Sequence, residues 1–149
     1  MHFNVTASPS ARWVIQQLRE TFPNEPIHRF LIYDNDSIFS TAVTSAIMGF
    51  EIDTKRTAFR SPWQNGTAER FVGSVRRELL DHVVVMNEDH LRRLLREYTE
   101  YYNNERVHTS IGDAPNGRAM ESRPSGRAKI IGFPRVGGLH NRYAWREAS

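Results

Sequence analysis

Two acidic side chains stand where metal-dependent phosphate chemistry could take place. Asp34 follows the apolar run Phe30–Tyr33, which is typical of a buried strand, and open α/β sheets bind ligands beyond the carboxyl ends of their strands. Glu69 comes 35 positions later, near the start of a helix expected from about Ala68 to His82. Carboxylate oxygens are the ligands that Mg²⁺ prefers. Each acid also has a structural explanation, because an Asp after a strand often caps the next helix and a Glu is stabilised at a helix N-terminus.

The helix that begins near Glu69 is predicted to be amphipathic, with about 100° of rotation per residue. Its expected buried face consists of Phe71, Val72, Val75 and Leu79. The opposite face carries Glu69, Gly73, Arg76 and Leu80, with Arg77 nearby. A carboxylate and an arginine two turns apart on one exposed face could hold a metal ion beside a phosphate group.

The alternate acids Asp34 and Asp36 also invite comparison with a calcium-binding loop. In such a loop further oxygen ligands follow at every second position, and a glycine makes the turn. Here the next alternate position is Ile38, and Phe39 stands where the turn glycine belongs. The pattern excludes this type of calcium site.

Strands and helices are predicted to alternate around these residues. Strands are expected at residues 2–6, 30–33 and 50–54. A first helix is expected between a cap at Ser8–Ser10 and a stop at Pro23. Further helices are expected at residues 40–48, 68–82 and 88–102. The apolar face of the last helix consists of Leu91, Leu94, Leu95 and Tyr98. The β-α-β-α-β order predicts an α/β layer fold.

Two segments break this alternation. Residues 57–67 contain Pro62 and Gly66 and show little periodicity, so we expect an exposed and mobile loop there. Beyond Asn104 the chain is rich in Pro, Gly and Arg, and we do not expect this part to form a core.

The two acids share a context with a known family. Asp34 begins an Asp-Asn-x-Ser-x-Phe pattern, and Glu69 follows a Pro-x-x-Asn-Gly loop at residues 62–66. The combination resembles the integrase core shared by retroviral integrases and many bacterial insertion-sequence transposases. The resemblance implies an RNase H-like α/β fold, in which helices flank a mixed sheet and three carboxylates hold Mg²⁺ or Mn²⁺. It also implies DNA strand transfer between transposon ends and a target.

The resemblance assigns roles to individual residues. Asp34 is expected to be the second catalytic, metal-binding acid and Glu69 the third. Asn65 and Arg76 fall where the family places DNA contacts, and Arg77 and Arg60 are expected to join them. A later Tyr-Asn-x-x-Arg-x-His pattern at residues 102–108 is also similar to bacterial members. Its structural interpretation is a helix C-terminus capped by Asn.

The family's first catalytic Asp lies on a strand well before the second. Here only Glu20 and Glu25 precede Asp34, in or just after a predicted helix. We therefore expect a core that is incomplete at its N-terminus, occupying residues 1–104, with an Arg-rich extension at 105–149. Without the acid that bridges two metal ions, little autonomous activity is expected.

Charge and composition agree with a nucleic-acid partner. The net charge is +3, and eighteen of the twenty basic residues are arginine, whose planar fork of donors suits phosphate. Cysteine is absent, which excludes disulfides and thiolate metal sites and fits the cytoplasm; no membrane partner is expected. The family further implies a homo-oligomer. Two alternatives stay open: a non-catalytic DNA-binding remnant, and an RNase H-like nuclease that cuts RNA–DNA hybrids.

Overall fold

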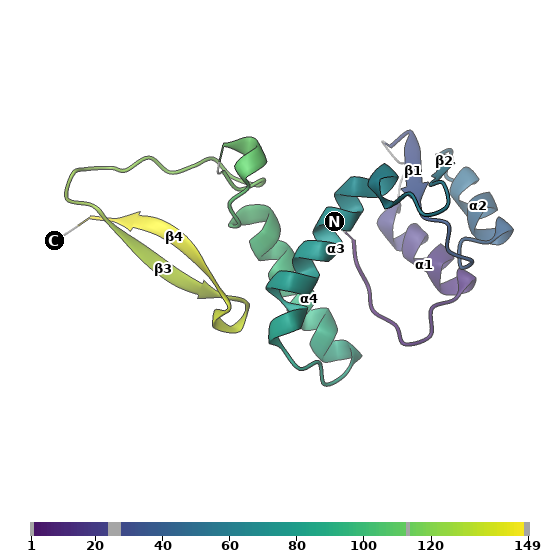
Figure 1. Cartoon of the computed structure of the whole chain (residues 1–149), viewed down its shortest axis with the longest axis horizontal. Coiled ribbons are helices and arrows are strands. Elements are labelled where there is room, and N and C mark those ends of the chain that lie inside the picture. The colour runs from purple at the N-terminus through teal and green to yellow at the C-terminus, as the bar shows by residue number, and fades with distance from the viewer. Residues whose placement is uncertain (1, 24–27, 113, 148–149) are drawn as a thin grey trace. The chain divides into compact units, whose positions relative to one another are not determined.

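The computed structural model describes residues 2–23, 28–112 and 114–147. The chain divides into two compact units, an N-terminal unit of residues 2–74 and a C-terminal unit that begins at Val75. Figure 1 labels the helices and strands of both units along the chain.

The N-terminal unit opens with helix α1 (Ala11–Thr21), as its capping signals predict. The side chain of Ser10 accepts a hydrogen bond from the backbone of Trp13, which satisfies one of the free N–H groups at the helix start. At the other end, the backbone N–H of Phe22 bonds to the carbonyl of Leu18, and Pro23 follows. Proline cannot continue a helix, so α1 stops here.

A β-α-β unit follows α1, as the apolar runs predict. Strand β1 (Phe30–Tyr33) and strand β2 (Asp53–Arg56) are parallel neighbours, and helix α2 (Thr41–Met48) connects them. Tyr33, Val43, Ile47 and Ile52 form the buried core, and α1 adds Val14, Ile15 and Leu18. Figure 1 shows α1 and α2 beside the two strands.

One strand prediction in this unit is wrong and another is misplaced. Residues 2–6 form no strand, and the side chains of His2 and Asn4 bond to Gln17 on α1. Strand β2 begins at Asp53 rather than at residue 50. Its first expected residues form a turn after α2, in which the N–H groups of Phe50 and Glu51 bond back to helix carbonyls.

The predicted multi-stranded sheet is only partly present. Within residues 2–23 and 28–74, the sheet consists of β1 and β2 alone. The described chain is a mixture of helices and small two-stranded sheets, without the larger mixed sheet of an RNase H-like fold. Of the two acids that precede Asp34, Glu20 lies on α1 and Glu25 lies outside the described residues.

The loop predicted at residues 57–67 has more structure than its irregular sequence indicates. It contains a short 3-10 helix, η1 (Pro62–Asn65), and helix α3 (Gly66–Glu78) starts directly after it. A second 3-10 turn, η2 (Leu80–His82), replaces the expected last turn of the helix. The predicted buried face of α3 is partly wrong, because Val72 is 61% exposed. The buried residues of α3 and its end are Ser74, Val75 and Leu79.

The C-terminal unit is built on helix α4 (Glu88–Asn104), which confirms the helix expected at 88–102. The Asn87 side chain caps its start by accepting a hydrogen bond from the backbone of His90. Leu94 and Tyr98 are buried, while Leu91 and Leu95 are half-buried, so the predicted apolar face faces the interior. A short turn, η3 (Thr109–Ile111), lies beyond the helix.

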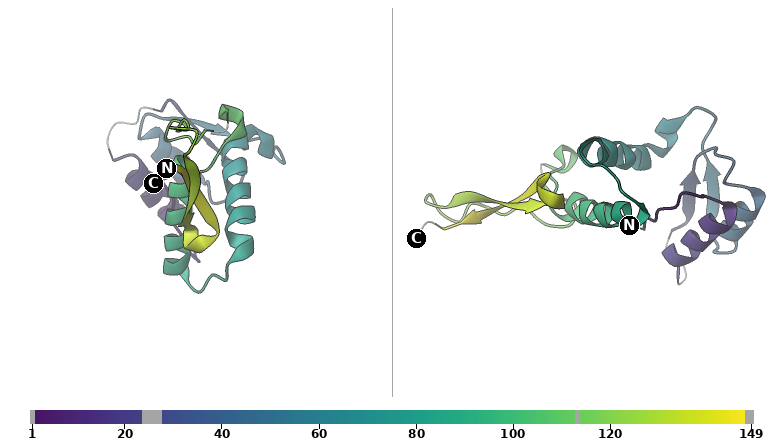
Figure 2. Two further views of the ribbon diagram at one scale, coloured as in Figure 1. Left: turned by 90° about the vertical axis from the view of Figure 1, so that its left-hand side faces the viewer. Right: turned by 90° about the horizontal axis from the view of Figure 1, so that it is seen from below.

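Part of the Arg-rich segment beyond Asn104 forms a β-hairpin, which the sequence analysis did not predict. Strand β3 (Lys129–Arg135) pairs antiparallel with strand β4 (His140–Arg146), and the turn η4 (Val136–Gly138) joins them. Figure 2 shows this twisted two-stranded ribbon. Val136 is buried, and Arg135 donates to the carboxylate of Glu105 at 2.7 Å. Cross-strand partners are invisible to local periodicity, which explains the error.

Across the described ranges, none of the helices is long and apolar enough to cross a membrane.

Candidate active site

Asp34 lies at the carboxyl end of β1, at the start of the loop that leads to α2. One of its carboxylate oxygens accepts a hydrogen bond from the backbone N–H of Asp36 at 3.2 Å. Asp36 in turn accepts a bond from the N–H of Ile38 at 2.8 Å. The two acids therefore shape the loop through their own backbone, and both side chains remain exposed.

Arg56 holds this loop in place, and the sequence offered no signal for that role. Its guanidinium donates to the backbone carbonyls of Asp36 at 3.3 Å and Phe39 at 3.0 Å. Arg56 reaches them because it ends β2, in register with Tyr33, the residue just before Asp34. The contact thus follows from strand pairing, which brings together residues about twenty positions apart.

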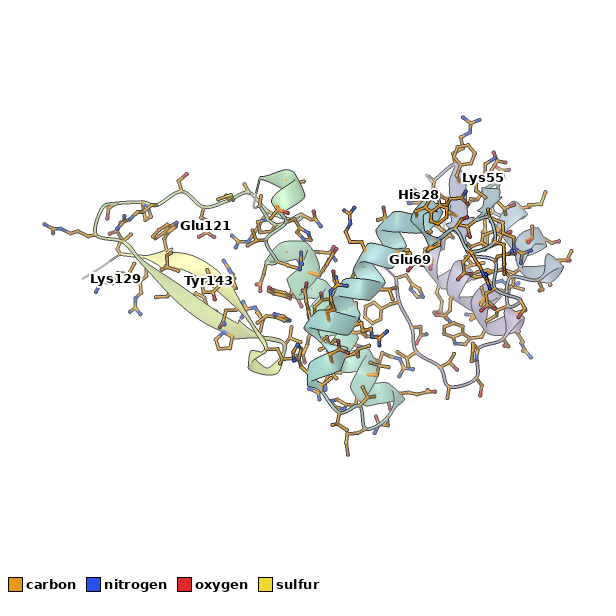
Figure 3. All side chains as sticks on the ribbon, viewed as in Figure 1. His28, Lys55, Glu69, Glu121, Lys129 and Tyr143 are labelled. Carbon is orange, nitrogen blue, oxygen red and sulfur yellow. The ribbon has the colours of Figure 1, made fainter. Side chains whose placement is uncertain are left out.

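Glu69 lies in the first turn of α3, where its negative charge is favoured by the helix dipole. Its side chain is exposed, and Figure 3 labels it on this helix. Asn65, at the end of η1, is half-buried. Arg60 is exposed, and its guanidinium lies over the ring of Phe59 at 5.1 Å.

Arg76 and Arg77, on the last turn of α3, belong to the C-terminal unit. Both side chains are exposed, and Arg76 makes only a loose ion pair with Asp81 at 3.9 Å. No hydrogen bond or ion pair joins any two of the six predicted site residues within the described chain. Asp34, Arg60, Asn65 and Glu69 all lie in the N-terminal unit.

The metal ion implied by the resemblance can be tested against the donors present. Asp34 and Glu69 supply carboxylate oxygens of the right kind. Within the described ranges, however, no group of three His, Cys, Asp or Glu side chains is placed to hold an ion. These residues alone do not fit a centre that needs three carboxylates.

A second polar cluster, which sequence reasoning missed, surrounds Glu78 at the end of α3. Arg106 binds both carboxylate oxygens of Glu78, with the shortest nitrogen–oxygen distance at 2.7 Å. The buried hydroxyl of Tyr98 donates to the same carboxylate at 2.9 Å. The ring of His140 bonds to the backbone carbonyl of Glu78 at 2.8 Å and stacks on Tyr101. The cluster joins α3, α4, the segment after α4 and the start of β4.

This environment shifts the pKa values of its members. Burial acts to raise the pKa of the Glu78 carboxyl, but the hydrogen bonds from Arg106 and Tyr98 and the charge of Arg106 outweigh it, so that pKa is lowered. Burial and the bond to Glu78 raise the pKa of the Tyr98 hydroxyl far above its ordinary value. Glu78 is therefore ionised and Tyr98 neutral at physiological pH.

The Tyr-Asn-x-x-Arg-x-His pattern at residues 102–108 falls in and beside this cluster. Asn103 donates to the carbonyl of Thr99, and His108 bonds to the carbonyl of Tyr102 at 3.0 Å. Arg106 is the partner of Glu78. In the structure the pattern ends α4 and ties it to α3, as its helix-terminus interpretation predicts, but the C-cap is Glu105 rather than an Asn.

Comparison with protein families finds a match for part of the chain. Residues 50–115 match the family model of the integrase core domain, and no curated protein matches the chain. The matched residues include Glu69 and its neighbouring candidates, whereas Asp34 precedes them. This family carries out DNA integration and transposition, and its cores generally use divalent metal ions. The resemblance to a DDE-type integrase or transposase catalytic core is thereby confirmed over residues 50–115.

Proposed function

We propose that this chain acts on DNA as part of an insertion-sequence transposase, with Asp34 and Glu69 as the second and third acids of an RNase H-like core. The match of residues 50–115 to the integrase core carries the proposal. It is supported by the position of Asp34 at the carboxyl end of a parallel strand, where open sheets bind ligands. Residues 1–104 would form the core and 105–149 its extension.

The chain by itself would not carry out strand transfer. Two-metal phosphoryl transfer needs carboxylates that position both ions, and the described residues bring together no group of three. A third acid from outside these residues, for instance from another copy of the protein, would be required for activity with Mg²⁺ or Mn²⁺. The homo-oligomer implied by the family is measurable by sedimentation.

A specific observation favours the second candidate, non-catalytic DNA binding, for the chain on its own. Lys129 and Arg146 are direct cross-strand partners in the hairpin, although like charges placed opposite each other are destabilising. Arg127 precedes them, and none of the three makes an ion pair with a described residue. Figure 3 labels Lys129 on this hairpin. A row of such cations suits the phosphate backbone of DNA.

A strand-transfer assay tests the catalytic part of the proposal. Purified full chain is mixed with labelled duplex DNA and Mg²⁺ or Mn²⁺, and Glu69→Gln is the control. We expect DNA binding in a gel-shift assay but no joined product. Joined product that disappears with Glu69→Gln would show that the chain is an autonomous enzyme, and absence of any DNA binding would refute the whole proposal.

The placement of the two acids is tested separately, through binding rather than activity. If Asp34 and Glu69 face DNA phosphates, their charges oppose binding when no metal is present. The double variant Asp34→Asn/Glu69→Gln should then bind duplex DNA about threefold or more tightly in EDTA at low salt. The matched control Glu51→Gln/Asp53→Asn removes two exposed acids from the same unit. Equal effects of the two double variants would show only a general change of net charge.

A further inference from the structure

Two large aromatic side chains are exposed in the segment that precedes Glu69. Phe59 and Trp63 are each 73% exposed, more than any other described aromatic side chain. Both belong to the segment between β2 and α3, and Trp63 stands six positions before Glu69. Large apolar groups left in water mark a surface that binds a partner when they gather in one place.

The segment that carries them is built rather than irregular. The carboxamide oxygen of Gln64 accepts a hydrogen bond from the backbone N–H of Ala58 at 2.7 Å, which closes the loop on itself. The N–H of Ser61 bonds to Ala58 and that of Gln64 bonds to Ser61. Pro62 opens η1, with its backbone angle already set for a helical turn. These contacts hold both aromatic rings outward on a defined framework.

Arg60, between the two rings, adopts a strained backbone conformation. Its φ angle is +55°, a left-handed value that costs a side-chain-bearing residue roughly 1–2 kcal/mol. Its guanidinium lies over the Phe59 ring and makes no ion pair with a described residue. Residues held in such conformations often occur at binding sites, where the surrounding structure maintains the strain.

The charges and aromatic rings of the segment indicate which kind of partner it would bind. From residue 54 to residue 68 the chain contains three cations, Lys55, Arg56 and Arg60, and no acid. An apolar protein surface would bury the charge of Arg60 without a counter-ion, which is costly. A DNA strand instead offers a phosphate for the guanidinium and a flat base for each ring. Aromatic side chains stack on unpaired bases of any sequence, because every base has a π-face.

We propose that Phe59 and Trp63 form a stacking platform for an unpaired base of the DNA strand at the candidate active site, with Arg60 against the adjoining phosphate. The inference rests on the proposed function, since it requires that the chain binds DNA. Duplex bases are stacked on one another and shielded, so the platform binds a frayed end or a single-stranded overhang. It thereby favours DNA ends over continuous duplex.

The test is a double-mutant cycle between the protein and the DNA. Fluorescence anisotropy measures the Kd of the full chain for a duplex with a short 3′ overhang, and for the same duplex with an abasic nucleotide at each overhang position in turn. Trp63→Ala should raise the Kd for the intact overhang about 5- to 100-fold. When the abasic nucleotide stands at the position whose base stacks on Trp63, Trp63→Ala should change the Kd less than about twofold, because the stacking partner is already missing. Trp63→Phe, which keeps a ring, should fall between the wild type and Trp63→Ala.

Controls separate stacking from loss of folding or of DNA binding in general. Trp63 is exposed, so its replacement removes little buried area, and circular dichroism checks that the variant folds. Met48→Ala removes another exposed apolar side chain of the same unit and should leave every Kd unchanged.

The possible failures are distinguishable. If the wild-type chain binds no DNA, the proposed function itself is refuted. If it binds DNA but Trp63→Ala has no effect, or weakens intact and abasic overhangs equally, the stacking platform is refuted and the proposed function stands. If Phe59→Ala/Trp63→Ala instead abolishes self-association in sedimentation, the two rings contact a second copy of the chain.

Discussion

At the scale of single residues, Glu78 and Arg106 form a two-point ion pair in the C-terminal unit. Both side chains are about a quarter exposed, and Tyr98 adds a buried donor. Glu78→Gln leaves the guanidinium of Arg106 without its charged partner, so the free energy of unfolding should fall by about 1–3 kcal/mol. Urea denaturation measures this loss. The control Arg93→Gln breaks the exposed pair with Glu97 and should cost less than about 0.5 kcal/mol.

The same carboxyl group predicts a pH dependence. Its pKa in the folded chain is below the ordinary value of 4.5 that applies in the unfolded chain. The stabilisation is therefore fully present above pH 4.5 and is lost as the pH falls below that value toward the folded pKa. Unfolding of the wild type and of Glu78→Gln is compared by urea titration from pH 7 down to pH 3. The difference between them should shrink below about pH 4.5, and a constant difference would contradict the shifted pKa.

At the scale of elements, the hairpin depends on the turn between β3 and β4. Gly138 has a φ angle of +93°, which side chains other than glycine rarely adopt. Gly138→Ala should therefore destabilise the C-terminal unit by about 1–2 kcal/mol. The matched control is Gly132→Ala in β3, where an added methyl group meets only ordinary contacts with Tyr143 and Asn141. Thermal unfolding of the two variants compares them, and an equal loss in both would show that the turn is not the cause.

Elements differed in how far local sequence determined them. Helices α1 and α4 were predicted because caps, stops and apolar spacing all lie within the segments themselves. Strand β2 was placed three residues early, because Phe50 packs on the core from a turn rather than from a strand. The hairpin was missed altogether, since its Pro, Gly and Arg content gave no clear period-2 alternation, although its two strands follow each other directly in the sequence.

At the scale of the whole molecule, the cations of the Arg-rich extension predict how DNA binding responds to salt. The variant Arg127→Gln/Lys129→Gln/Arg146→Gln removes three cations in and beside the hairpin that make no ion pair with a described residue. On duplex DNA, each lost phosphate contact should reduce the slope of log Kd against log salt by about 0.9. Measurements of Kd over a range of NaCl concentrations, with Arg93→Gln as the control, give this slope. An unchanged slope would place the DNA contacts outside the hairpin.

The sequence by itself determined the family, the candidate acids and most helices. Motifs such as Pro-x-x-Asn-Gly before Glu69 and caps such as Ser10 act over a few residues, so they can be read without knowledge of the fold. Their roles in DNA chemistry stay predictions.

Only the tertiary structure decided which distant groups meet. Arg56 reaches the loop after Asp34 through the pairing of two parallel strands. Glu78 meets Arg106 from 28 positions away and His140 from 62. The exposure of Trp63 and Val72 likewise depends on what the rest of the chain covers. Periodicity describes which side of an element is apolar, whereas contacts and exposure depend on how the elements pack.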